Sequence, residues 1–155
     1  MIEPKLENFK LNFSNKKNQV IFKRLAGDLE TAVSLMIKLT NNKNYSFLLE
    51  SVTGGEIRGR YSIIGMEPDL IWKCKGNKSK IKRNAQRKKS KFEVCSNPPL
   101  IELRKIISES KIDFPEKIPE MSAGLFGYIG YDMIRLVENL PKTNKDDLEL
   151  PDSIF

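Results

Sequence analysis

The sequence predicts an α+β domain, in which helices pack on a mostly antiparallel β-sheet. Two observations predict this class. Two segments carry apolar residues at helical spacing, and several short segments rich in β-branched and aromatic residues are joined by turns. With 155 residues, of which 39% are hydrophobic and 30% charged, the chain can bury a core and is too apolar to be disordered.

The first predicted elements are a strand, a helix and a hairpin. Residues 20–25 form an early strand that ends at a Gly27-Asp28 turn. Apolar residues over positions 29–39 fall on one face at helical spacing, which predicts an amphipathic helix packed on a sheet, with Asp28 as its N-cap. Residues 45–49 contain the apolar run Phe47-Leu-Leu49, which predicts a strand inside the sheet, and residues 60–65 are expected to return beside it.

A second hairpin and a helix follow. Residues 70–75 alternate apolar and basic side chains, Gly76-Asn77 supplies a turn, and residues 79–83 start back. The single tryptophan, Trp72, is expected to be a half-buried strand residue. Pro98-Pro99 opens a helix, since proline is tolerated in a first turn. Its predicted apolar face consists of Leu100, Leu103, Ile106 and Ile107.

Three glycines recur at every third position near the end of the chain, at Gly124, Gly127 and Gly130. This spacing differs from that of a dinucleotide-binding loop, and it predicts close backbone packing in an aromatic strand. Asp132 is expected to cap a short helix after that strand. Residues 148–155 end on apolar side chains and are expected to enter another strand.

The formal charge of +7 is local. Ten Lys and Arg residues, and no Asp or Glu, lie between Lys73 and Lys91. Such a cluster raises the hypothesis of a basic module that binds nucleic acid or an acidic surface. Aromatic residues are not interleaved after Trp72, and lysine is abundant throughout the chain, so nucleic-acid binding is not favoured.

Composition also excludes several kinds of chemistry. The chain has no histidine, and its two cysteines, Cys74 and Cys95, are too far apart for a Cys-x-x-Cys pair. Two reduced, partly buried thiols on strands are expected. There is no apolar run long enough to cross a bilayer and no signal-peptide pattern at the start of the chain, so a cytoplasmic protein is expected.

The turn after residue 49 carries polar groups suited to a zwitterionic ligand. Glu50 can accept from an ammonium group, Ser51 adds a hydroxyl, and Arg60 can pair with a carboxylate. The alternative is a hairpin whose polar residues simply face water.

Three motifs occur in order along the chain, namely Leu48-Leu-Glu-Ser51 with the following Gly59-Arg-Tyr-Ser62, Pro99-Leu-Ile-Glu-Leu-Arg104, and Gly124-Leu-Phe-Gly-Tyr-Ile-Gly-Tyr-Asp132. Together they resemble anthranilate synthase component I, the chorismate-using subunit of tryptophan biosynthesis. The resemblance implies that residues 1–155 form the N-terminal regulatory region of that enzyme. In this family a longer C-terminal region builds the chorismate site, so we expect these residues to be catalytically inactive alone, with no catalytic residue among them.

For the whole enzyme, the resemblance implies Mg²⁺-dependent conversion of chorismate and ammonia to anthranilate and pyruvate. A glutamine amidotransferase subunit, component II, would supply the ammonia. The Mg²⁺ site is expected outside these residues. The resemblance also implies part of a feedback-inhibition pocket for L-tryptophan. Its expected residues are Leu49, Glu50, Ser51 and Arg60.

Alternatives remain open at this stage. Arg58 can replace Arg60 in the pocket, and either arginine can instead form an ion pair with Glu56. Within the family, the large subunit of aminodeoxychorismate synthase, from folate biosynthesis, is the closest rival. A free-standing amino-acid sensor is a rival of another class.

Overall fold

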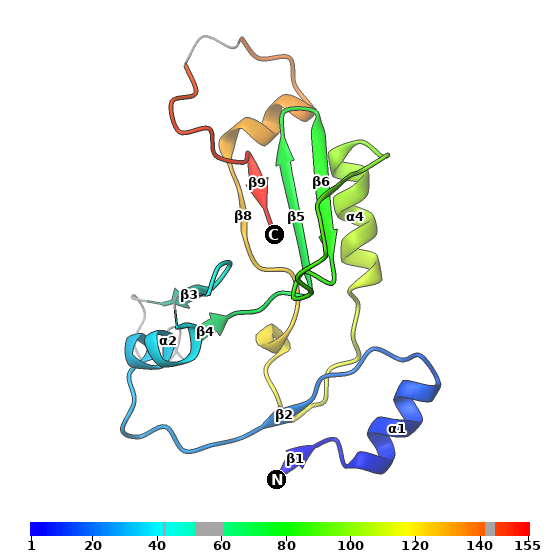
Figure 1. Ribbon diagram of the computed structural model, residues 1–155, viewed down its shortest axis with the longest axis vertical. Coiled ribbons are helices and arrows are strands. Elements are labelled where there is room, and N and C mark those ends of the chain that lie inside the picture. Colours follow the sequence, from blue (N-terminus) through cyan, green and yellow to red (C-terminus); the bar gives the residue numbers. More distant parts are fainter. Residues whose placement is uncertain (42, 52–60, 142–144) are drawn as a thin grey trace. The chain divides into compact units, whose positions relative to one another are not determined.

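The computed structural model describes residues 1–41, 43–51, 61–141 and 145–155 (Figure 1). Helices account for 26% of the residues and strands for 21%, and every strand pairing within the described ranges is antiparallel, which confirms the α+β class. The chain divides into two compact units. Unit 1 comprises Met1–Met66 and Ser110–Gly124, and unit 2 comprises Glu67–Glu109 and Leu125–Phe155.

Unit 1 begins with a small two-stranded sheet. Strand β1 (Ile2–Glu3) pairs with β2 (Phe22–Lys23), and helix α1 (Leu6–Ser14) lies between them in sequence. The early strand predicted over residues 20–25 is therefore present but shorter. The later part of unit 1 contains the 3₁₀ helix η1 (Glu120–Ser122). It contacts this sheet through Lys117, whose ammonium lies 2.9 Å from the Glu3 carboxylate.

The rest of unit 1 is helix α2 (Ala32–Thr40) followed by strands β3 (Phe47–Glu50) and β4 (Ser62–Gly65). Thr31, rather than the expected Asp28, is the N-cap of α2. Its hydroxyl accepts from the Ser34 amide at 3.0 Å, and the Ser34 hydroxyl accepts from the Thr31 amide at 2.9 Å. This reciprocal pair is a capping box.

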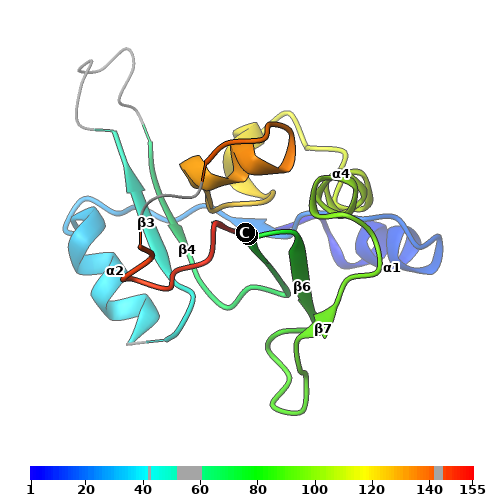
Figure 2. The same ribbon diagram turned by 90° about the horizontal axis from the view of Figure 1, so that it is seen from above.

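Unit 2 is built on a five-stranded sheet with the strand order β7-β6-β5-β9-β8. Strands β8, β9, β5 and β6 are labelled in Figure 1, and β7 is labelled beside β6 in Figure 2. The predicted hairpin is confirmed as β5 (Leu70–Lys75) and β6 (Lys78–Arg83). Strand β9 (Ser153–Ile154), from the last residues of the chain, pairs with β5 on one side and with β8 (Tyr128–Ile129) on the other. The short strand β7 (Glu93–Val94) pairs with β6.

Helix α4 (Pro99–Glu109) packs on this sheet and closes the core. Leu103 and Ile106 are buried as predicted, whereas Ile107 is 50% exposed and lies outside the core. Trp72 is fully buried rather than half-buried, because the ring of Phe155, the residue after β9, packs against it with ring centroids 6.3 Å apart. The cluster of buried residues is Trp72, Cys74, Ile81, Leu103, Ile106 and Met133.

Close backbone packing explains two of the three glycines. A Cβ at Gly127 would lie 1.9 Å from the Ile154 carbonyl oxygen, and one at Gly130 would lie 2.8 Å from the Asp152 carbonyl oxygen. Gly124 has open space around it, and there the backbone conformation, with φ of +148°, favours glycine.

The 3₁₀ helix η2 (Tyr131–Leu136) follows β8, so the predicted junction of strand and helix is present. The capping role expected for Asp132 is wrong. Gly130 occupies the N-cap position, while the Asp132 carboxylate accepts from Arg135 Nε at 2.6 Å. Asp132 lies inside the first turn and stabilises it through this ion pair.

The two thiols are reduced and differ in their surroundings. Cys74 lies on β5 with 1% of its surface exposed, and burial raises the pKa of its thiol to about 11. Cys95 is half-buried and lies just beyond β7 rather than on a strand. Among the helices that the structure describes, none is both long and apolar enough to cross a lipid bilayer.

Candidate functional site

The residues expected to contact a ligand lie on the β3–β4 hairpin of unit 1. The antiparallel register pairs Leu48 with Ile64, Leu49 with Ile63, and Glu50 with Ser62. Because directly opposed residues share a face of the sheet, Glu50 and Ser62 project from one face and Leu49 from the other. The hairpin therefore presents a polar pair and an apolar side chain on opposite faces.

Helix α2 and an aromatic contact support this hairpin. α2 packs along both strands (Figure 1). The Phe47 ring lies over Gly65, so that a Cβ at position 65 would be 2.1 Å from the ring. Glycine at this position lets the aromatic ring pack against the neighbouring strand. Residues 45–49 were predicted to form a strand inside the sheet, whereas within the described residues β3 pairs only with β4.

A weak hydrogen bond joins the last residue of β3 to the first residue of β4. The Ser62 hydroxyl donates to a Glu50 carboxylate oxygen over 3.5 Å, at the upper limit for such a bond. Both side chains are exposed. Ser62 was not among the predicted site residues, although the register that follows from pairing Phe47 with Gly65 places it opposite Glu50.

The predicted site residues differ in what the structure describes. Leu49 is 48% exposed, and Glu50 and Ser51 are exposed, so the three lie together at the end of β3. Arg60 lies outside the described residues, as do the alternatives Arg58 and Glu56.

This arrangement offers hydrogen-bonding groups rather than reactive ones. A carboxylate and two hydroxyls can accept from an ammonium group, and Leu49 offers an apolar surface. No histidine exists in the chain to act as a general base. In the described ranges no group of three or more His, Cys, Asp or Glu side chains is placed to hold a metal ion.

The sequence matches several characterised proteins over nearly its whole length. Anthranilate synthase component 1 of Cereibacter sphaeroides is 52% identical over 149 residues, which cover 96% of this chain and 30% of that protein. The protein of the same name from Acetivibrio thermocellus is 37% identical over 155 residues, covering 100% of this chain and 30% of the relative. The one from Synechocystis is 32% identical over 159 residues, with the same two coverages.

The chain is a homologue of anthranilate synthase component 1. The resemblance recognised from the three sequence motifs is thereby confirmed, and the similarity lies in the N-terminal region of that enzyme. The chain spans about 30% of the length of the curated relatives it matches. No family model matches it.

Proposed function

We propose that this protein is the N-terminal regulatory part of an anthranilate synthase component 1 and acts in tryptophan biosynthesis. The observation that carries the proposal is 52% identity to a protein of that name over 96% of the chain. The reaction of the whole enzyme would convert chorismate and ammonia, or glutamine, to anthranilate and pyruvate.

The chain's own role would be to sense the end product. We place part of an L-tryptophan pocket at the end of β3, with Leu49, Glu50, Ser51 and Arg60 as its residues. The exposed Glu50 carboxylate and the Ser51 hydroxyl supply acceptors for the ligand ammonium, and Leu49 supplies an apolar contact. Arg60 would pair with the ligand carboxylate.

An inhibitor that binds away from the reacting atoms acts only if it binds one conformation better than another. Tryptophan at the β3–β4 hairpin would favour the arrangement of the enzyme in which chorismate does not react. Leu49, Glu50 and Ser51 are exposed, and Leu49 projects from the face opposite to that of Glu50, so they supply only part of a pocket. Weak binding by these 155 residues alone is the expected result.

Other requirements of the whole enzyme lie beyond the described site. The described residues do not fit the Mg²⁺ that the resemblance implies, since no suitable ligand group is found among them. No catalytic step is therefore assigned to them, and these residues alone are expected to lack activity. The relatives are named component 1, which supports the existence of a second component. We propose that this second component is the glutamine amidotransferase subunit.

Calorimetric titration with L-tryptophan tests the proposal, first on these residues and then on the whole enzyme that contains them. Ser51→Phe should abolish saturable binding, because the added ring fills the space of the ligand, and tryptophan inhibition should be lost while much of the activity remains. Ser14→Phe is the matched control, since Ser14 is another exposed serine of unit 1.

The outcomes separate the competing readings. Unchanged inhibition in Ser51→Phe would contradict the placement of the pocket. Phenylalanine binding as tightly as tryptophan would contradict its specificity. Tryptophan binding by neither sample, together with formation of aminodeoxychorismate by the whole enzyme, would favour the folate-pathway relative.

A further inference from the structure

The hairpin of unit 2 places lysines directly opposite one another. The β5–β6 register pairs Lys73 with Lys80 and Lys75 with Lys78. Because side chains alternate between the two faces of a strand, these lysines project from the face opposite to that of Trp72. We call this surface the lysine face. Its residues are Lys73, Lys75, Lys78, Lys80 and Lys82.

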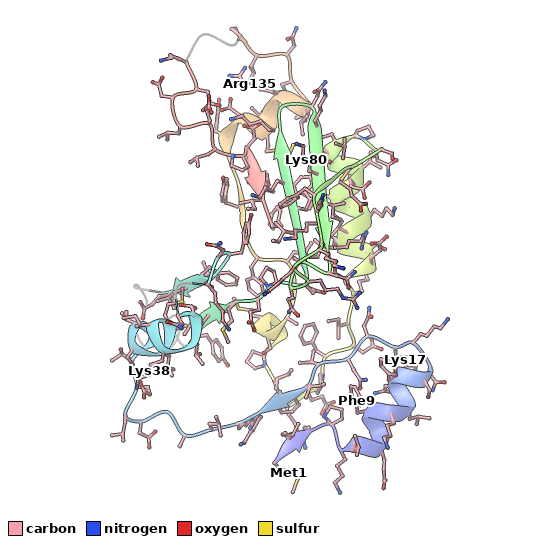
Figure 3. The ribbon with its side chains drawn as sticks, viewed as in Figure 1. Met1, Phe9, Lys17, Lys38, Lys80 and Arg135 are labelled. Carbon is pink, nitrogen blue, oxygen red and sulfur yellow. The ribbon has the colours of Figure 1, made fainter. Side chains whose placement is uncertain are left out.

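The lysine face is only partly neutralised. Lys75 forms an ion pair with Asp146, and the Lys73 ammonium lies 4.9 Å from the centre of the Phe92 ring. Lys78, Lys80 and Lys82 have no carboxylate within ion-pair distance in the described part of the chain. Lys80, labelled in Figure 3, is exposed. Like charges directly opposite each other destabilise a sheet, so an anion bound on this face would reduce the electrostatic repulsion between the paired lysines.

The segment after β6 extends the same charge on an ordered scaffold. The Ala85 amide donates to the Asp69 carbonyl at 2.8 Å, and the Gln86 side chain donates to the Glu67 carbonyl at 2.6 Å. These bonds tie the segment to the residues that precede β5. It carries four exposed basic residues, namely Arg87, Lys88, Lys89 and Lys91.

The spacing of the lysines indicates the kind of anion. Lys78, Lys80 and Lys82 occupy every second position of β6, which gives a repeat of roughly 6.6 to 6.8 Å. An extended peptide with carboxylates at alternate positions has the same repeat. Nucleic-acid recognition instead favours arginine forks and open aromatic rings. The basic residues of the lysine face are all lysines, and the Phe92 ring contacts the Lys73 ammonium.

We propose that the lysine face binds an acidic segment of a partner protein, extended along β6 and carrying carboxylates at alternate positions. The core cluster around Trp72 lies on the other side of the sheet, where α4 packs, whereas Ile71, paired with Lys82, is buried on the lysine face. Binding along the exposed Lys78 and Lys80 therefore requires no rearrangement of the core cluster. The attraction between exposed charges falls with ionic strength, which makes the interaction sensitive to salt.

A peptide of alternating glutamate and threonine is the probe, and its affinity is measured by fluorescence anisotropy at several salt concentrations. The triple variant Lys78→Glu, Lys80→Glu, Lys82→Glu should bind at least about tenfold more weakly than the parent, because three attractions become repulsions. Its fold should persist, since glutamate at position 80 would face Lys73 across the strands. Replacement of the same three lysines by glutamine should give an intermediate loss.

The matched control is Lys10→Glu, Lys16→Glu, Lys17→Glu, which changes the net charge equally at exposed lysines of unit 1. It should retain most of the affinity. An equal loss in both triple variants would show that net charge alone drives binding. Tighter binding of a thymidine oligonucleotide than of the peptide would make this a nucleic-acid surface, and absence of binding at low salt would also overturn the proposal.

Discussion

Replacement of Gly127 by alanine tests the packing of β8 against β9. The new Cβ would lie 1.9 Å from the Ile154 carbonyl oxygen and 2.8 Å from its carbonyl carbon, where ordinary van der Waals contact begins at 3.4 Å. The obstacle is backbone rather than the end of a flexible side chain. The two chain segments must therefore move apart by about 1.5 Å, the difference between 1.9 and 3.4 Å.

Such a shift has an expected cost of about 2 to 4 kcal/mol, which combines about 1 to 3 for overpacking with about 1 for a lost hydrogen bond. The bond at risk runs from the Gly130 amide to the Asp152 carbonyl, at 2.7 Å. Urea unfolding followed by tryptophan fluorescence measures the cost, because Trp72 is the single tryptophan and is fully buried in the core of unit 2. The midpoint should fall by about 1 to 2 M.

Two further glycines give a graded series of controls. Gly130→Ala should cost less than Gly127→Ala, because the nearest backbone oxygen would be 2.8 Å away. Gly27→Ala should leave the midpoint nearly unchanged, since a Cβ there meets nothing within 4 Å. Equal midpoints for the Gly127 and Gly27 variants would refute the explanation by close backbone packing.

Three other predictions follow from local contacts. In the folded protein a thiol reagent at pH 8 should label Cys95 well before Cys74, whose pKa is raised to about 11 by burial, and equal rates would contradict this. The Arg83 guanidinium lowers the pKa of the Glu109 carboxyl below 4.5, so Glu109→Gln should reduce the stability of the protein at pH 7. The difference in stability between the variant and the parent should shrink as the pH falls through 4.5 and below, and a difference that is independent of pH would exclude this linkage. Thr31→Ala should destabilise α2 by about 1 kcal/mol and raise amide hydrogen exchange in its first turn about fivefold, whereas Thr31→Ser should not.

Local patterns in the sequence predicted the local structure well. The β5–β6 hairpin was predictable because apolar and basic residues alternate on both sides of Gly76-Asn77. The same alternation predicted one polar face, which is the lysine face. The helix after Pro98-Pro99 was also predictable, although its burial pattern was not, because the contacts of α4 with the sheet determine which residues it buries.

Contacts between distant parts of the chain were harder to predict from the sequence. No local pattern places β9 between β5 and β8, and the full burial of Trp72 depends on this arrangement. At the candidate site, the motif identified Leu49, Glu50 and Ser51, while Ser62 became visible only through the register of β4 with β3. The N-cap of α2 was misassigned because Asp28 and Thr31 are both good capping residues by type, and only the structure decides between them.

Unit 1 consists of two stretches that are separate in the sequence, so the ribosome synthesises them at different times. Met1–Met66 lacks the complementary stretch Ser110–Gly124, which includes the lysine that pairs with Glu3. At about 5 to 20 residues per second, the ribosome needs roughly 3 to 12 s to add residues 67–124, which complete the second stretch. For that interval the nascent first stretch lacks the contacts that Glu3, Asn18 and Arg24 make with the second stretch. A nascent chain arrested just before Ser110 should therefore be cleaved by a protease more readily than one extended beyond Gly124.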